Sequence, residues 1–294
     1  MSSAYVSGPR IEDALAACGA LDERGYSSTV CYWNSGGDPP DQVAAAYLAA
    51  VAALSASATD TCLSVKVPAL EFSPELVGRV LADARANEVP VHIDALSLES
   101  APGTVALLHE AAAAHPDLGV TLPSIWSRSV EDAELALELD LSVRVTKGQW
   151  PADGSQAVDA ETGFLRLVDR LAGRARKVAI ATHDPSLARE ALGRLLATGT
   201  PCELEQLFGL APHRAVRVAY ESSVPVRVYV PYGRPMAPYR PRNAARDPRV
   251  LWWGAQDLAL GRNKGWRYLD RLRPLAAAPR ALASTGLSSS PPNA

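Results

Sequence analysis

The stretch CLSVKVPALEFSPELVGRVLADARANEVPVHIDAL, residues 62–96, contains one complete strand–helix–strand unit. It opens with the apolar run CLSVKV and closes with VPVHIDAL, and the β-branched residues of both runs are typical of strands. Between them, Ser73 stands before Pro74 and Glu75. A hydroxyl that can cap a helix, followed by a proline in the first turn, predicts a helix start, and the helical pattern extends over 73–87.

The same unit repeats along the chain. Eight short apolar runs begin at residues 29, 62, 89, 118, 141, 177, 201 and 226, so their starts are roughly 23 to 36 residues apart, about the length of a strand plus a helix. Helical patterns fill the intervals, for example over 41–56 and 129–139, and a further one over 10–25 precedes the first run. The runs are continuous rather than alternating, as in parallel strands that helices cover.

These features predict an α/β fold, a (β/α)8 TIM-type barrel with an extra N-terminal helix. An open doubly wound sheet is the alternative, but it would not need eight evenly spaced strands, and no GxGxxG opens the first helix. We expect an N-terminal helical segment over 1–27, the barrel over 28–270 and a tail over 271–294. The Ser/Pro-rich end of this tail, STGLSSSPPNA, is typical of disorder.

Composition excludes several classes of function. The 294 residues are 48% hydrophobic and 21% charged, with a net charge of -3, an ordinary globular profile. Because the 29 basic and 32 acidic residues are mixed along the chain, a nucleic-acid partner is not expected. No run reaches the ~18 apolar residues of a membrane span, and MSSAYVSGPR lacks the pattern of a secretory signal. We therefore predict a cytoplasmic protein without an integral membrane segment, whose only membrane contact would be peripheral, at the inner face.

The cysteines and histidines show no pattern of a metal site. The four cysteines are scattered in apolar surroundings without CxxC spacing, and the five histidines lack zinc-ligand spacing. We expect buried free thiols and no metal: Cys18, Cys31, Cys62 and Cys202.

Polar side chains occur inside or just after the apolar runs, where a barrel of this type carries its chemistry. They are Lys66, Asp94, Arg144 with Lys147, Thr182 with His183, Glu203 with Glu205, and Tyr229. Buried charges are costly unless they are paired, so a ring of them indicates mutual neutralisation or a ligand.

Each of these residues also has a structural interpretation. Lys66 and Asp94 lie on neighbouring runs, and a structural ion pair is as good an interpretation as a catalytic one. His183 fits a core histidine. The cations around Gly148 fit either a solvated loop or a phosphate cradle. Of the two glutamates, we expect one to face the barrel and the other the helices, with Glu205 the structural or exposed one.

Six motifs resemble the proline dehydrogenase family in order and spacing. They are LSVKVPAL (63–70), HIDAL (92–96), RVTKG (144–148), ATHD (181–184), CELEQLFG (202–209) and YVPYG (229–233), and the resemblance extends from about residue 28 to 253. Members of that family are distorted (β/α)8 barrels that hold FAD and oxidise L-proline to Δ1-pyrroline-5-carboxylate. The resemblance therefore implies a flavin-dependent oxidoreductase of proline catabolism, with a quinone as an expected electron acceptor.

The resemblance also implies roles for the matching positions. Lys66, Asp94 and Tyr229 correspond to the catalytic polar network at the substrate end. A second segment, PYRPRN, would bind the substrate, because a guanidinium fork grips a carboxylate and aromatic rings enclose the apolar ring carbons; its residues are Tyr239, Arg240, Arg242 and Asn243. The cofactor contacts would be Arg144 beside the flavin N5 region, Lys147, Gly148, Trp150, Thr182 and His183.

The chain departs from the family pattern at several of these places. Asn243 replaces a second arginine, and an amide carries no charge with which to bind a carboxylate. Pro123 and Ile125 replace a glutamine and a tyrosine, Leu96 an acidic residue, and Gln149-Trp150 an Ala-Tyr pair. These losses concern the substrate more than the fold, and a related cyclic amine or weak proline turnover is consistent with them.

Two other functions stay open. Lys66 or Lys147 at a barrel mouth would suit a Schiff-base lyase, since an amine can attack a carbonyl there. A barrel that kept ligand binding but lost turnover would explain the substitutions at Leu96, Pro123 and Asn243.

Overall fold

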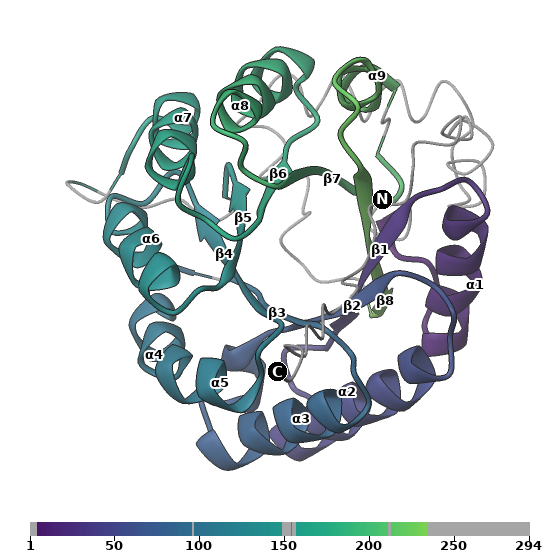
Figure 1. Cartoon of the computed structure of the whole chain (residues 1–294). Coiled ribbons are helices and arrows are strands. Elements are labelled where there is room, and N and C mark those ends of the chain that lie inside the picture. The colour runs from purple at the N-terminus through teal and green to yellow at the C-terminus, as the bar shows by residue number, and fades with distance from the viewer. Residues whose placement is uncertain (1–4, 96, 149–153, 155–156, 211–212, 235–294) are drawn as a thin grey trace, which may run out of the picture.

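Eight parallel strands pair in sequence order and close into a barrel in the computed structural model of the chain (Figure 1). They are β1 (Ser27–Trp33), β2 (Thr61–Val65), β3 (Val91–Ile93), β4 (Leu118–Pro123), β5 (Ser142–Thr146), β6 (Val178–Ala181), β7 (Cys202–Leu207) and β8 (Val226–Gly233). The ring closes where β8 lies beside β1, with Ser27 opposite Arg227 and Trp33 opposite Gly233. The predicted (β/α)8 barrel is confirmed.

The structure describes residues 5–95, 97–148, 154, 157–210 and 213–234. The predicted tail and the segment PYRPRN lie outside these ranges. The expected limit at 270 lies outside them too, and the division into domains at 27 and 270 stays a prediction.

Helices form the outer layer of the barrel (Figure 1). In chain order they are α1 (Ile11–Asp22), α2 (Pro40–Ser55), η2, a short 3-10 turn (Val67–Leu70), α3 (Pro74–Ala86), α4 (Ala101–Ala106), α5 (Leu108–Ala114), α6 (Ser129–Glu138), α7 (Ala160–Leu171), α8 (Pro185–Ala197) and α9 (His213–Glu221). The extra N-terminal helix is α1, which packs against both β8 and β1 and so covers the seam where the barrel closes.

Local sequence explains where several helices begin. Ser73 caps α3 as predicted, because its hydroxyl accepts a hydrogen bond from the Leu76 amide at 3.2 Å. Asp184 caps α8 by accepting from the amides of Ser186 and Leu187. This cap follows β6 directly, so it fixes the chain just beyond Thr182 and His183.

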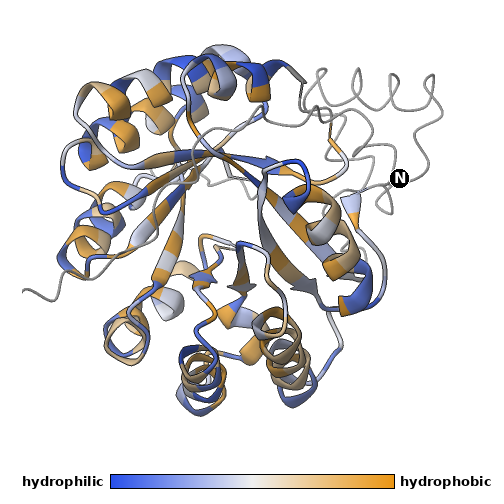
Figure 2. Cartoon of the chain, turned by 45° about the vertical axis from the view of Figure 1, so that its right-hand side comes forward, coloured by the Kyte–Doolittle hydropathy of each residue, from blue (hydrophilic) through white to orange (hydrophobic). Residues whose placement is uncertain are grey.

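The main hydrophobic core lies between the strands and the helices. Figure 2 shows orange, apolar faces of the helices turned toward the barrel and blue faces turned outward. Strand residues such as Val143 and Val145 point into this layer and are at most 1% exposed. Phe164 on α7 is fully buried there, which stabilises the fold by about 2 kcal/mol.

The opposite face of each strand points into the barrel, and much of it is polar. Because side chains alternate along a strand, Arg144 faces inward between the outward Val143 and Val145.

Among the described residues, none of the helices combines the length and the apolar character that crossing a membrane would require. Within the same ranges, no cluster of three His, Cys, Asp or Glu side chains could hold a metal ion.

Candidate active site

A buried polar network occupies the middle of the barrel, and Asp94 is its centre. The Asp94 Oδ2 atom accepts a hydrogen bond from the Tyr229 hydroxyl at 2.7 Å and another from Ser64 at 3.3 Å. Its Oδ1 atom accepts from Thr121 at 3.2 Å. Arg144 pairs with the same carboxylate, and its Nη1 lies 3.6 Å from Oδ1. Four strands thus converge on the carboxylate that follows β3.

Arg144 is the cation of this network and is 3% exposed. Its Nε donates to the Glu205 Oε2 atom at 2.9 Å, and its Nη1 donates to the Thr121 hydroxyl at 3.3 Å. The guanidinium carbon lies 5.1 Å from the centre of the Tyr229 ring, a cation–π contact. Burial acts to lower the pKa of Arg144, but the carboxylates of Glu205 and Asp94 outweigh it and raise the pKa. The guanidinium is therefore charged.

Tyr229 is held in its neutral form. Burial raises the pKa of its phenol well above the ordinary value, and the adjacent Asp94 carboxylate raises it further. The hydroxyl therefore keeps its proton and donates it to Asp94 in a hydrogen bond. Such a charge-assisted bond fixes the direction of both side chains.

Lys66 lies at the end of β2 and is 4% exposed. Its ammonium group is 3.4 Å from the Tyr32 carbonyl oxygen and 5.5 Å from the centre of the Trp33 ring. Burial raises the pKa of the nearby Cys31 thiol, the charge of Lys66 acts to lower it, and the charge of Asp94 acts to raise it. The three residues predicted as catalytic, Lys66, Asp94 and Tyr229, therefore share one neighbourhood.

The end of β5 carries the predicted phosphate turn. Gly148 has a φ of +94°, which a side chain rarely adopts. A Cβ atom there would come within 2.8 Å of the Ile125 side chain and 3.1 Å of Pro123. Lys147 is 33% exposed at its side chain and lies 3.4 Å from Glu161 and 3.9 Å from Asp184. Glycine is thus required for the turn, and the cation beside it is accessible.

The end of β6 carries Thr182 and His183. The Thr182 hydroxyl accepts from the Asp184 amide at 3.2 Å, and its carbonyl oxygen accepts from Gln206 at 2.6 Å. The Nε2 atom of His183 accepts from the Leu207 amide at 3.0 Å. This bond identifies Nε2 as the unprotonated nitrogen of a neutral imidazole.

The expectation for Glu203 and Glu205 was wrong. Both side chains point into the barrel, and the residues are 5% and 4% exposed. Residues two apart on a strand share a face, which is the signal that should have placed them together. Glu205 belongs to the central network rather than to the surface. Sequence reasoning also missed the hydroxyls of Ser64 and Thr121.

A second, lower layer of charge fills the barrel near the start of its strands. Arg227 donates from Nε to Glu203 at 2.9 Å, and Lys177 lies 2.8 Å from the same carboxylate. Burial acts to raise the pKa of Glu203, but Arg227 and Lys177 outweigh it and hold the pKa at about 2. Asp60 lies 3.3 Å from the other end of Arg227. This cluster is at the end of the barrel opposite Lys66.

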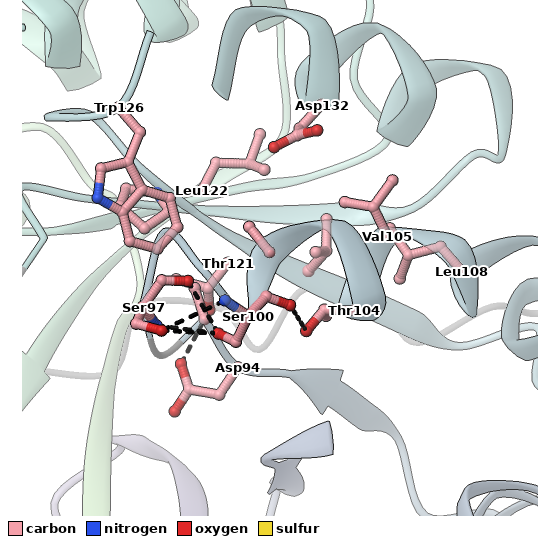
Figure 3. A pocket seen from close by; sticks show the side chains of 14 residues that line it. Asp94, Ser97, Ser100, Thr104, Val105, Leu108, Thr121, Leu122, Trp126 and Asp132 are labelled. Atoms are coloured by element: carbon pink, nitrogen blue, oxygen red, sulfur yellow. Dashed lines mark hydrogen bonds between the residues drawn. The ribbon is translucent and has the colours of Figure 1, made fainter. Parts of the chain in front are cut away.

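A small cavity borders the central network at Asp94 and Thr121, between the ends of β3 and β4 and the helices α4 and α6 (Figure 3). Its volume is about 20 Å³. This is room for about one water molecule and much less than the ~300 Å³ or more of a small-molecule site. The figure shows Thr121 joined to Asp94, with Trp126 and Leu122 on the far side of the cavity. It is therefore not the substrate pocket.

Five predicted site residues lie outside the described part of the chain, so their roles stay predictions. They are Trp150, Tyr239, Arg240, Arg242 and Asn243.

Taken together, the fold and the site define a (β/α)8 barrel that gathers buried charges and neutral hydroxyls at its interior, the layout of a barrel enzyme. No protein-family model matches the chain. It is 25% identical over 260 residues to proline dehydrogenase 1 of Bacillus subtilis subsp. natto. The aligned region covers 83% of this chain and 86% of the relative. It is 24% identical over 284 residues to the proline dehydrogenase of Deinococcus radiodurans, covering 89% and 91% of the two chains.

Solved structures agree on the fold. Proline utilization A (PutA) from Bdellovibrio bacteriovorus, inactivated by N-propargylglycine, superposes with a TM-score of 0.67 at 15% identity, over 85% of this chain. The chain spans about a third (32%) of the length of that PutA chain. The resemblance that the motifs indicated is confirmed: this chain is a relative of the proline dehydrogenases, and its similarity supports an enzyme of this kind.

Proposed function

We propose that the chain oxidises L-proline or a close cyclic amino acid to the corresponding Δ1-imine acid, with FAD as its cofactor. The observation that carries this proposal is the network of Asp94, Tyr229 and Arg144 at the inner surface of the barrel. It is formed by residues of the very motifs that resemble proline dehydrogenases. The similarity to curated proline dehydrogenases over 83% of the chain supports the same reaction.

The residues at the ends of β5 and β6 fit FAD in charge and in shape. Arg144 and Lys147 supply positive charge for a ring that becomes more negative on reduction and for a diphosphate. Gly148, with its φ of +94°, lets the backbone turn where a side chain would meet Ile125. Thr182 and His183 add polar groups beside this turn. When bound, FAD supplies the two-electron acceptor that the protein side chains lack.

The protein's own part in the reaction is to bind, orient and deprotonate the substrate. In this proposal Arg242, aided by Arg240 or Asn243, binds the substrate carboxylate, and Tyr239 encloses its carbons. The ring nitrogen then lies toward Lys66, Asp94 and Tyr229. Because Tyr229 is neutral and bonded to Asp94, the Asp94 carboxylate is the group of this pair that would accept the proton lost by the amine.

A spectrum of the purified protein tests the cofactor, and anaerobic titration tests the reaction. We expect a flavin absorption band that bleaches on addition of L-proline, hydroxyproline or pipecolate. A colourless protein that stays colourless after reconstitution with FAD would contradict the proposal. Trapping of a keto acid on Lys66 or Lys147 by borohydride, with no flavin, would favour the Schiff-base lyase instead.

A binding protein without turnover is the second candidate, and Pro123 favours it. This residue faces the barrel at the end of β4, where a proline side chain offers no hydrogen bond to a ligand. A flavin that binds but is not bleached by any cyclic amino acid would support this candidate.

Substitution of Arg242 tests the carboxylate contact. We expect Arg242→Ala to raise the KM for L-proline by about 10- to 100-fold, the effect of losing one charged hydrogen bond of about 1.5–3 kcal/mol, with unchanged flavin content. Arg240→Ala tests whether the neighbouring guanidinium shares the task. Arg79→Ala, an exposed arginine on α3, is the control. An unchanged KM in both the Arg240 and Arg242 variants would contradict the assignment.

The quinone acceptor, the cytoplasmic location and the peripheral membrane contact stay predictions. Measurement of turnover with soluble quinones, with and without vesicles, addresses the acceptor and the contact together.

A further inference from the structure

Glu205 and Arg144 form an ion pair across the barrel interior. They come from β7 and β5, and the strand between them, β6, carries only alanines on the facing side. Ala179 is opposite Arg144 and Ala181 is opposite Glu205. Because these side chains are small, the guanidinium reaches over β6 to the carboxylate at 2.9 Å. The sequence of β6 thus makes the contact possible.

The pair is buried and directional. Each of its two side chains is 4% exposed. Glu205 accepts from Nε, the inner nitrogen of the guanidinium, while Nη1 is directed to Thr121 and Asp94. Two carboxylates therefore offset one cation, and the Nε contact fixes the plane of the guanidinium. Charges act strongly on one another at this depth because little water screens them.

The two glutamates of β7 differ in how their charge is compensated. Glu203 contacts two cations, Arg227 and Lys177, and is held fully ionised. Glu205 has one cation: burial raises its pKa, and Arg144 opposes that effect only in part. The charges of Glu203 and Arg227 in the lower layer also act on the pKa of Glu205, in opposite directions, but Arg144 is the cation that bonds to it.

We propose that Glu205 is a positioning residue that fixes Arg144 and offsets its charge, and that it thereby lowers the electron affinity of the flavin. This inference rests on the proposed function, in which Arg144 lies beside the reactive edge of the cofactor. A reduced flavin carries more negative charge than an oxidised one, so a neighbouring cation favours reduction. A carboxylate bonded to that cation weakens the effect.

The variant Glu205→Gln removes the charge and keeps the shape. We expect its flavin to be easier to reduce: at a fixed dye potential the ratio of reduced to oxidised flavin should rise at least tenfold. For two electrons this is about 30 mV. The dissociation constant for sulfite, an anion that adds to the electron-poor flavin, should fall by a similar factor. Neither readout depends on turnover.

Glu203→Gln is the matched control. It makes the same change on the same strand, in a buried glutamate two residues away that bonds to Arg227 rather than Arg144. We expect its flavin to keep the potential and the sulfite affinity of the unchanged protein. If Glu205→Gln does not fold, Glu205→Asp keeps the charge with a shorter reach, and its potential should rise by a smaller amount.

The outcomes separate the inference from the proposed function. If L-proline bleaches the flavin but the Glu205 variants keep the original potential, the inference alone is wrong. If both glutamine variants shift the potential equally, the effect is general and the inference is also wrong. If no flavin binds, the inference and the proposed function are overturned together.

Discussion

Tyr229 combines two roles in one side chain. Its hydroxyl donates to Asp94 at 2.7 Å, and its ring faces the guanidinium of Arg144 at 5.1 Å. The phenol stays protonated because burial raises its pKa well above the ordinary value. In the proposed reaction, the neutral Tyr229 hydroxyl orients the Asp94 carboxylate relative to the substrate amine and adds no charge of its own.

The variant Tyr229→Phe separates these roles, because the ring remains while the hydrogen bond is lost. We expect the rate of flavin reduction by L-proline to fall by about 10- to 100-fold, which corresponds to loss of a charge-assisted bond of about 1.5–3 kcal/mol. Flavin content should not change. Stopped-flow reduction under anaerobic conditions measures the rate.

Tyr232→Phe is the control for this prediction. Tyr232 is also on β8 and buried, but it points outward and its hydroxyl donates to the Ala46 carbonyl oxygen at 3.4 Å. We expect its rate to match that of the unchanged protein. Equal rates of flavin reduction in both variants would show that the Tyr229 hydroxyl has no part in the reaction.

The sequence singled out members of the buried network where an ionisable group interrupts an apolar run, and their roles stay predictions. Lys66, Asp94, Arg144 and Tyr229 stood out for this reason. Thr121 did not, because a β-branched residue with a hydroxyl is ordinary in a strand, and only the structure shows that it bonds both Asp94 and Arg144. Glu205 was misjudged because the two-residue period of a strand was not applied to it.

At the scale of elements, the turn after β5 is the most constrained connection near the site. Gly148 combines a φ of +94° with a Cβ position 2.8 Å from Ile125. The variant Gly148→Ala therefore meets both a strained backbone and a steric clash, and we expect a loss of about 1–3 kcal/mol in the free energy of unfolding. We also expect weaker FAD retention, since Lys147 would shift with the turn. Urea unfolding and flavin content measure the two effects.

Gly199→Ala provides the comparison. Gly199 has a φ of +68°, but nothing lies within 4 Å of a Cβ built there. Its variant should lose only the conformational part, about 1 kcal/mol, and should retain FAD. If the two variants lose the same free energy of unfolding and the same flavin content, the contact with Ile125 does not contribute to either.

The positions of the elements followed from the sequence, but their ends did not. The helix expected over 73–87 is α3, Pro74–Ala86, because Ser73, Pro74 and an apolar stripe agree locally. The strand expected from residue 89 is only Val91–Ile93. Its hydrophobic run continues beyond the paired residues, and hydrophobicity alone does not tell a strand from a buried loop.

At the scale of the whole molecule, the barrel interior has two polar layers, one at the candidate active site and one that is structural. The layer around Asp94 faces the end where barrel enzymes carry their chemistry, and its carboxylates outnumber its arginine. The layer around Glu203 lies toward the start of the strands, and its charges are closely matched. Conventional barrels fill this space with branched apolar side chains. Here Glu203 on β7 pairs with Arg227 on β8 and with Lys177 before β6, and Arg227 also pairs with Asp60 before β2, so the lower layer links the starts of four strands.

Acid unfolding should therefore depend on the lower layer. The folded-state pKa of Glu203 is about 2, below its ordinary value of 4.5. A lowered pKa means that the ionised carboxylate contributes stability above pH 4.5, and that this contribution is lost as the pH falls toward 2. The shift corresponds to roughly 3 kcal/mol.

We expect Glu203→Gln to reduce the free energy of unfolding at pH 7 and to flatten its fall between pH 4.5 and 2, measured by urea unfolding at a series of pH values. Glu190→Gln, in an exposed pair with Arg194 on α8, should keep the original slope because such pairs contribute little. A Glu203 variant with the same slope as the unchanged protein would show that acid acts elsewhere in the barrel.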